Sequence, residues 1–276
     1  MTPQAYICFA CGTQFPESEN TPNSCLICED ERQFVPATGQ RFTTMKELRA
    51  NCQNEVRQVD DGLFEIFIRP SFGIGQRAYL VQTPQGNVLW DCVSLIDPGT
   101  VSTLWALGGV AAIAISHPHY YTSMVEWSRA FGGIPIYTHA ADRKWVARTD
   151  PAIQFWDGER LELLGAVTLI RCGGHFEGGS ILHWAAGAAG KGILLPGDVI
   201  QVVPDHRWVS FMYSYPNLVP LNAQAVSKIL VALQPFPFDR IFGAFGHVVD
   251  EDGSGAVKRS AERYIKAIEP IERVGA

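Results

Sequence analysis

Histidine or aspartate residues follow five of the strands that the sequence predicts. His117 and His119 come after 110–116, His139 after 134–137, His175 after 167–171, Asp198 after 193–195 and His247 after 240–244. Imidazole and carboxylate groups are common ligands of catalytic metal ions in proteins. Loops at the carboxyl ends of strands are where α/β domains build their sites. The pattern therefore predicts a metal site assembled from side chains that are far apart in the sequence.

Four cysteines near the N-terminus form two CxxC pairs. Cys8 with Cys11 and Cys25 with Cys28 are separated by thirteen residues, a spacing that suits one tetrahedral thiolate site. The polar stretch between the pairs cannot bury a core of its own, so metal binding would supply most of its folding free energy. The segment 1–43, called the knuckle below, resembles a zinc ribbon or a rubredoxin-type site. Zinc is the first expectation for its metal and iron the second.

The knuckle is expected to have a structural role, because four thiolates leave no open position on a tetrahedral metal ion. Docking of a protein partner is the other role that such a segment could have. Neither role makes the cysteine cluster a catalytic site.

The composition is that of a globular protein. Of 276 residues, 47% are hydrophobic and 18% are charged, and the formal net charge is −6. These values exclude a disordered chain, and the acidic balance makes a nucleic-acid partner unexpected. No apolar run reaches the roughly 18 residues of a membrane helix, and the N-terminus lacks the pattern of a secretory signal. With paired thiols that indicate a reducing compartment, the sequence predicts a cytoplasmic location and no membrane partner.

Short β-rich runs alternate with helical ones from about residue 56 onwards. Further predicted strands are 63–69, 78–83, 87–91 and 180–184, and predicted helices are 101–107, 124–131, 140–147, 222–233 and 256–269. Ser123 and Glu126 form a capping-box pattern before the second of these helices. Strands mixed with helices predict sheets that are covered by helices. We expect a main domain over 56–276, joined to the knuckle by a linker helix over 44–55.

The main domain resembles the metallo-β-lactamase superfamily over about four-fifths of the chain. The signature of that family is HxHxDH, followed by a later His, a later Asp after a glycine, and a final His after a glycine. His117-Pro118-His119 matches the first two ligands, and the others are matched by His175 in CGGH, Asp198 in LLPGD and His247 in FGH. The resemblance implies the α/β fold of that family, an αββα sandwich with the metal site at one edge, here preceded by a small knuckle domain.

The chain departs from the family pattern directly after His119. Tyr120, Tyr121 and Thr122 stand where the family has any residue, an aspartate and a histidine. The resemblance therefore implies a single metal ion, zinc or iron, and a degenerate second metal position. Tyr121 could donate a hydrogen bond to a developing oxyanion, or it could fill the vacant position by packing. Asp198 is the candidate base or fourth ligand.

Two further residues are candidates for contacting the metal ligands and holding them in position. Asp91 in VLWDC resembles the buried aspartate that the family carries on an early strand, and His139 ends a predicted strand. The aromatic stretch 208–218 is a candidate wall of a substrate pocket.

Three classes of function fit these residues. A metal-dependent hydrolase acting on a small ester, thioester or lactone fits three imidazoles with an open metal position, and it is the first expectation. A mononuclear non-haem iron enzyme of the persulfide-dioxygenase type fits His117, His175 and Asp198 as two histidines and a carboxylate. A non-catalytic interaction protein fits the loss of the second metal position. The sequence predicts a small-molecule substrate but neither its identity nor the oligomeric state.

Overall fold

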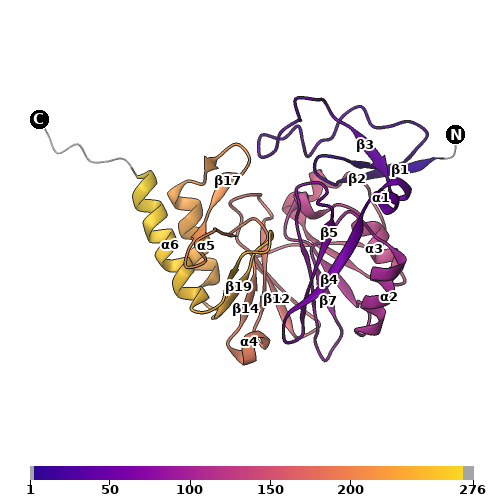
Figure 1. Cartoon of the computed structure of the whole chain (residues 1–276). Coiled ribbons are helices and arrows are strands. Elements are labelled where there is room, and N and C mark those ends of the chain that lie inside the picture. Colours follow the sequence, from indigo (N-terminus) through magenta and orange to yellow (C-terminus); the bar gives the residue numbers. More distant parts are fainter. Residues whose placement is uncertain (1–2, 270–276) are drawn as a thin grey trace, which may run out of the picture.

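The computed structural model describes residues 3–269, and its centre consists of two facing β-sheets (Figure 1). The first sheet has the strand order β10-β9-β8-β7-β6-β5-β4, and the second has the order β11-β12-β13-β14-β19-β20. Helices α2 (Pro98–Ala106) and α3 (Met124–Ala130) cover the outer face of the first sheet. Helices α5 (Ala223–Leu233) and α6 (Gly253–Ile268) cover the outer face of the second. These four layers form the expected αββα sandwich.

The strands of the two sheets are short and follow one another along the chain. The first sheet consists of β4 (Gln53–Asp60), β5 (Leu63–Arg69), β6 (Ala78–Val81), β7 (Val88–Trp90), β8 (Ala112–Ala114), β9 (Ile136–His139) and β10 (Ile153–Trp156). The second consists of β11 (Arg160–Leu163), β12 (Val167–Arg171), β13 (Ser180–Trp184), β14 (Ile193–Leu195), β19 (Arg240–Phe242) and β20 (Val248–Val249). Shorter elements are α4 (Gly187–Gly190), β15 (Gln201–Val202), β16 (Val209–Ser210), β17 (Met212–Ser214) and β18 (Val219–Pro220). Within residues 3–269, no helix combines the length and the apolar character that crossing a membrane requires.

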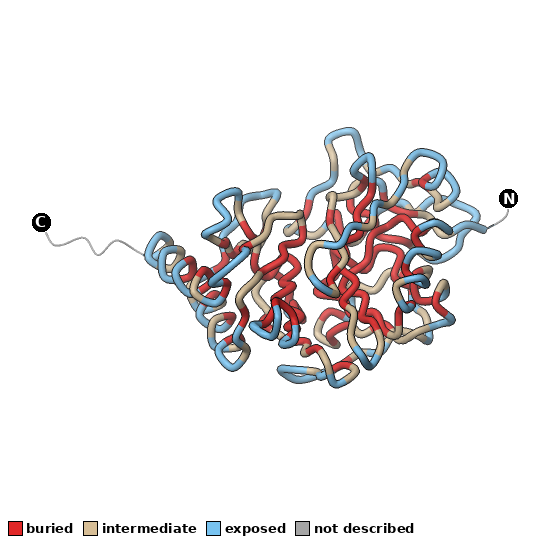
Figure 2. The backbone as a smooth tube through the Cα atoms, turned by 60° about the horizontal axis from the view of Figure 1, so that its bottom comes forward, coloured by how far each residue is buried: buried red, intermediate tan, exposed pale blue. Residues whose placement is uncertain are grey.

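Alternation along the strands divides the core into three hydrophobic layers. In β6, Leu80 packs towards α2 and α3, whereas the next residue, Val81, lies between the sheets. In β14, Leu194 packs towards α5 and α6, whereas Leu195 lies between the sheets. Successive side chains of a strand point to opposite faces, so a strand in a sheet that is buried on both faces needs consecutive apolar residues. Figure 2 shows the resulting band of buried backbone through both sheets.

The knuckle forms a separate small sheet, β2-β1-β3, beside the first large sheet (Figure 1). Its strands are β1 (Gln4–Cys8), β2 (Gln14–Ser18) and β3 (Phe42–Thr44). The Ser94 hydroxyl donates to the Gly12 carbonyl at 3.0 Å, and the Gln14 amide donates to the Thr122 carbonyl at 3.1 Å. The knuckle is therefore bonded directly to the main domain.

Most of the predicted elements are present, and four predicted strands, 63–69, 167–171, 180–184 and 193–195, have the same bounds in the structure. The helix predicted over 44–55 is wrong in its second half: α1 (Met45–Asn51) ends where β4 begins to pair with β5. The region predicted as a helix over 140–147 is a 3₁₀ helix, η2 (Ala140–Trp145).

The predicted capping box before α3 is also wrong. The Ser123 hydroxyl donates to the Ser94 carbonyl at 2.7 Å and does not cap the helix. A capping box is present instead at Thr44 and Glu47, at the start of α1. The Ser123 side chain is drawn into a long-range contact that sequence spacing alone does not reveal.

Candidate metal sites

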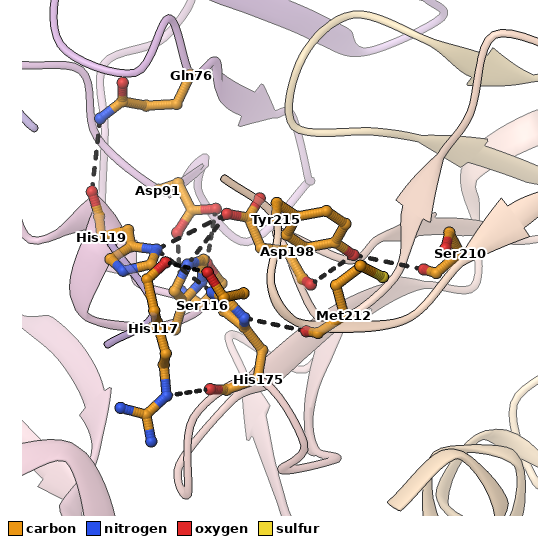
Figure 3. Close-up of polar contacts among 12 residues, drawn as sticks. Gln76, Asp91, Ser116, His117, His119, His175, Asp198, Ser210, Met212 and Tyr215 are labelled. Atoms are coloured by element: carbon orange, nitrogen blue, oxygen red, sulfur yellow. Dashed lines mark hydrogen bonds and ion pairs between the residues drawn. The ribbon is translucent and has the colours of Figure 1, made fainter. Parts of the chain in front are cut away.

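Four buried side chains of the main domain converge on one point (Figure 3). His117 and His119 lie in the turn after β8, which forms the 3₁₀ helix η1 (Pro118–Tyr120); His175 lies between β12 and β13, and Asp198 follows β14. One nitrogen or oxygen atom from each of the four lies within 4.8 Å of the other three. The Oδ2 atom of Asp198 is 3.5 Å from Nε2 of His117 and 3.9 Å from Nδ1 of His119. The Nδ1 atom of His119 is 3.3 Å from Nε2 of His175.

The loops that carry His117 and Asp198 can meet because residue 197 is a glycine. Gly197 has φ of +52°, and a Cβ atom there would lie 2.5 Å from the Ser116 hydroxyl oxygen. Such an overlap would push the two loops apart, and a side chain would also be strained at this φ. The strand end thus places Asp198 against the first two histidines only in the absence of a side chain at 197.

A chain of hydrogen bonds orients the His117 ring and sets which ring nitrogen faces the cluster. Asp91 accepts from the Ser116 amide at 2.7 Å and from the Ser116 hydroxyl at 3.0 Å. The Ser116 hydroxyl has only one proton and gives it to Asp91, so it accepts from Nδ1 of His117, 2.8 Å away. The Nε2 lone pair of His117 is therefore free and directed at the convergence point. Supporting hydrogen bonds of this kind orient metal-binding histidines.

The third histidine is held in the same manner. Nδ1 of His175 donates to the Met212 carbonyl at 3.2 Å, which leaves the Nε2 lone pair free (Figure 3). The Tyr215 hydroxyl donates to the Asp198 carbonyl at 3.1 Å and so fixes the backbone of the carboxylate ligand. Hydrogen bonds within the chain thus set both the orientation of the ring and the position of the backbone.

The charges of the cluster suit a cation. Burial lowers the pKa of His119 to about 4 and, together with the neighbouring His117, lowers the pKa of His175 well below its usual value. Burial alone would raise the pKa of Asp198, but its contacts with His117 and His119 outweigh burial and lower it. Neutral imidazoles and an ionised carboxylate are the protonation states that bind metal ions.

Unpaired polar atoms at this point also fit a metal ion. Among the described residues, Nε2 of His117 and Oδ1 of Asp198 are buried and have no hydrogen-bond partner. An unpaired buried polar atom costs about 1–3 kcal/mol, which coordination of a metal ion would remove. The donor set of three imidazoles and one carboxylate suits zinc, and it also suits iron.

His247 is not brought to this cluster. The backbone turns sharply after β19, where the Gly243 amide donates to the His247 carbonyl at 2.9 Å and the chain enters β20. This turn places the His247 ring beside His206, with Nδ1 and Nε2 of the two rings 3.2 Å apart. The resemblance-based assignment of His247 as a ligand therefore conflicts with the local backbone.

Tyr121 takes the packing role, one of the two roles that the sequence left open, and His139 does not contact the histidine cluster. The Tyr121 ring is buried, and its hydroxyl donates to the Asp142 carbonyl at 3.4 Å, so it does not reach the cavity as an oxyanion donor. His139 caps η2 by accepting from the Ala141 amide at 3.2 Å and contacts Trp156 with ring centroids 4.5 Å apart. Both side chains have packing roles in the structure. The neighbouring Tyr120 instead contacts the His117 ring, at a centroid distance of 5.1 Å.

The four knuckle cysteines form the second cluster. Sγ of Cys8 lies 3.7 Å from Sγ of Cys28, and Sγ of Cys11 lies 3.6 Å from Sγ of Cys25. All four are buried and none forms a disulfide. The Cys25 sulfur and burial raise the pKa of the Cys11 thiol well above its usual value. Four thiolates packed this closely repel one another unless a cation lies between them, as in tetrahedral structural zinc sites.

A cavity of about 310 Å³ leads to the histidine cluster. His119, His175 and Asp198 line its floor, and its walls come from both the knuckle and the main domain. The predicted aromatic wall is present in part, through Tyr215 and Pro216. The contribution of the knuckle has no signal in the sequence, because it depends on how two parts of the chain dock.

The comparisons with known proteins agree with this geometry. The uncharacterized protein YmaE of Bacillus subtilis (strain 168) is 49% identical over 265 residues, which cover 95% of this chain and 96% of YmaE. The solved structure of VMB-1 at pH 5.5 has a TM-score of 0.59 at 15% identity, covering 79% of this chain and 99% of that one. The metallo-β-lactamase FIM-1 of Pseudomonas aeruginosa, in its mono-zinc form, has a TM-score of 0.58 at 18% identity, covering 79% and 97%. No family model matches the sequence.

The identity to YmaE extends over both the knuckle and the main domain, whereas the likeness to the solved structures is a likeness of fold. The expectation of a metallo-β-lactamase-like sandwich is thereby confirmed. The chain belongs to the family of YmaE and has the metallo-β-lactamase fold, with a four-cysteine cluster added at its N-terminus.

Proposed function

We propose that this protein is a metal-dependent hydrolase with a single metal ion in its main domain. The ion would be held by His117, His119 and His175, which leave one position open, with Asp198 beside it as the base, and the substrate would be a small ester, thioester or lactone. The observation that carries the proposal is that three imidazoles and a carboxylate converge at the floor of a cavity large enough for a small molecule. The mono-zinc form of FIM-1, which has the same fold, supports a single ion as a stable state.

A metal ion bound at this point supplies a Lewis acid that polarises a carbonyl group and lets water attack at neutral pH. The residues of the chain hold the reacting groups. Asp198 presents a buried carboxylate with one unpaired oxygen, which can accept a proton from the attacking water. Ser116 and Met212 keep the rings of His117 and His175 from turning.

The position of His119 favours this proposal over non-haem iron chemistry. An iron site with two histidines and a carboxylate keeps vacant positions for oxygen and substrate. Here His119 lies beside His117 and His175, so the site offers three imidazoles. Three imidazoles are a donor set of catalytic zinc sites.

For the knuckle we propose a structural zinc ion bound by Cys8, Cys11, Cys25 and Cys28. The four sulfur atoms are buried and close, and they leave no open position for a substrate. The protein would then hold two metal ions of different function.

The experiment is metal analysis followed by activity assays. The purified protein should contain two equivalents of zinc, and the metal-replete protein should hydrolyse at least one member of a panel of thioesters, lactones, esters and phosphodiesters. In H117A and H175A, we expect one equivalent to be lost and hydrolysis to fall by about a thousandfold or more, since the polarising ion is removed.

The control is H206A, which removes an exposed imidazole that lies outside the cluster. This variant should keep both metal ions and full activity. Two retained equivalents in both H117A and H175A, or iron with oxygen consumption in the wild type, would contradict the proposal.

A further inference from the structure

The knuckle supplies one wall of the cavity that leads to the histidine cluster. Ala10, Gln33 and Phe34 of the knuckle line the cavity together with residues of the main domain. Phe34 is 52% exposed, so its ring stands at the rim and is not part of a core. A substrate that reaches the cluster must therefore pass along a surface of the knuckle.

Hydrogen bonds to the main domain fix this wall in place. Nε of Arg32 donates to the His175 carbonyl at 2.7 Å, and the guanidinium carbon lies 4.4 Å from the ring centroid of Phe176. The Ser214 hydroxyl donates to the Arg32 carbonyl at 3.0 Å, and the Asn217 amide group donates to the Gln33 carbonyl at 3.0 Å. Arg32 is thus a positioning residue that ties the wall to the backbone of a metal ligand.

The rest of the cavity lining above the floor is largely apolar. Besides the floor residues, the main domain contributes five residues to the lining, Gly73, Ile74, Tyr215, Pro216 and Phe245. The Tyr215 hydroxyl is already used by the Asp198 carbonyl. The described residues that line the cavity include no lysine or arginine. A carboxylate or phosphate above the floor would lose its hydration without gaining a cationic partner, which is costly.

We propose that Phe34 of the knuckle determines substrate specificity and that the cavity takes an uncharged, largely apolar acyl or alkyl group. The type of bond that is hydrolysed rests on the proposed function, whereas binding of the apolar group does not. The knuckle then has a second role beyond its own metal site, as the part of the chain that selects the substrate.

The test compares two probes of similar size, butane-1-thiol and 3-mercaptopropanoate, whose thiols can bind at the cluster. Binding to the zinc-loaded protein is measured by calorimetry. The uncharged thiol should bind at least tenfold more tightly. F34A should weaken it by about fivefold, because the variant removes apolar contact area, and should leave 3-mercaptopropanoate within twofold.

The matched control is V35A, since Val35 is the next residue, is 44% exposed and does not line the cavity. It should bind both thiols as the wild type does. Tighter binding of the anionic thiol, equal losses in F34A and V35A, or no binding of either thiol would overturn the inference.

A second measurement separates this inference from the proposed function. If some thioester is hydrolysed, F34A should reduce the gain in kcat/KM from acetyl to hexanoyl substrates. Hydrolysis with an unchanged chain-length dependence would overturn the inference and leave the proposed function standing. If no substrate is hydrolysed but the thiol preference and the F34A effect are present, the proposed function fails and the inference about the knuckle stands.

Discussion

The two ligand clusters of this protein are built in opposite ways. The knuckle cysteines lie within 21 consecutive residues, 8–28, and the buried apolar cluster around them consists of Ile27 and the cysteines themselves. The main-domain ligands are spread from His117 to Asp198, and each follows a strand of a sheet that is buried on both faces. The first cluster has close ligands and little core, and the second has distant ligands and a large core.

The difference indicates what each metal ion does for the fold. A segment without a core of its own depends on its metal ion, so binding free energy and folding free energy are the same quantity there. The sandwich buries enough apolar surface to fold by itself, so its ligands are in place before the ion binds. The knuckle metal should therefore control structure, and the main-domain metal should control chemistry.

The largest effect is expected from C25S, which removes one knuckle ligand. Structural zinc in knuckle-like peptides contributes roughly 10–16 kcal/mol of apparent binding free energy, and loss of a thiolate should forfeit several kcal/mol of it. We expect one metal equivalent to be lost and amide hydrogen exchange to rise throughout residues 3–43. The main domain should keep its metal and its own exchange protection.

The control for this variant is C52S, because Cys52 is half-buried and lies outside both clusters. It should exchange as the wild type does. Loss of both metal ions in C25S, or amide hydrogen exchange in the knuckle like that of the wild type, would contradict the contrast between the two clusters.

An intermediate effect is expected from D91N in the main domain. Asp91 accepts both hydrogen bonds from Ser116, and an amide would turn a donor towards one of them. Loss of such supporting contacts typically weakens metal affinity 10–100-fold, and we expect a weakening of that size in a competition assay with a chelator. D205N, at an exposed aspartate, should leave the affinity unchanged. Equal affinities in D91N and the wild type would mean that the ring of His117 is held by packing alone.

The smallest effect concerns the pH dependence of the sandwich, away from both clusters. Nε2 of His183 donates to the Pro237 carbonyl at 2.8 Å, and burial lowers the pKa of His183. Below about pH 6.5 the unfolded chain binds this proton before the native protein does, so stability falls as the pH falls. The fall amounts to about 1.4 kcal/mol for each unit by which the native pKa is lowered.

H183Q keeps a donor for Pro237 but does not titrate. Urea unfolding at pH 7.5 and pH 5.5 should therefore show a smaller loss of stability in the variant than in the wild type. The same loss in both proteins would assign the acid sensitivity to other groups.

Local patterns were sufficient for much of this structure. Alternating or continuous apolar runs predicted β5, β12, β13 and β14 with their bounds, and CxxC spacing predicted which cysteines meet. The strand-end rule named six residues at strand ends, and four of them converge, brought together from strands of both large sheets. Each of these predictions rests on contacts within a few residues or on a regularity of sheets.

The remainder depends on contacts that no local pattern encodes. His247 follows a strand as the four clustered residues do, but its turn into β20 directs it towards His206. Tyr121 fills a space between the η1 turn and the Asp142 carbonyl, next to the point where Gln14 of the knuckle bonds to Thr122. The residues in the second half of the family motif thus have packing roles. The absence of the aspartate and the histidine from the sequence does not by itself show this.

Gly73 lies where the main domain packs closely against the knuckle. It lies in the left-handed region, with φ of +61°, and a Cβ atom there would lie 3.2 Å from the carbonyl carbon of Cys11. A methyl group at position 73 would press on the backbone of Cys11, a member of the cysteine cluster, and this backbone would have to shift by a few tenths of an ångström. The knuckle and the main domain are therefore packed so closely at this point that one added carbon atom would displace the segment that carries two of the four cysteines.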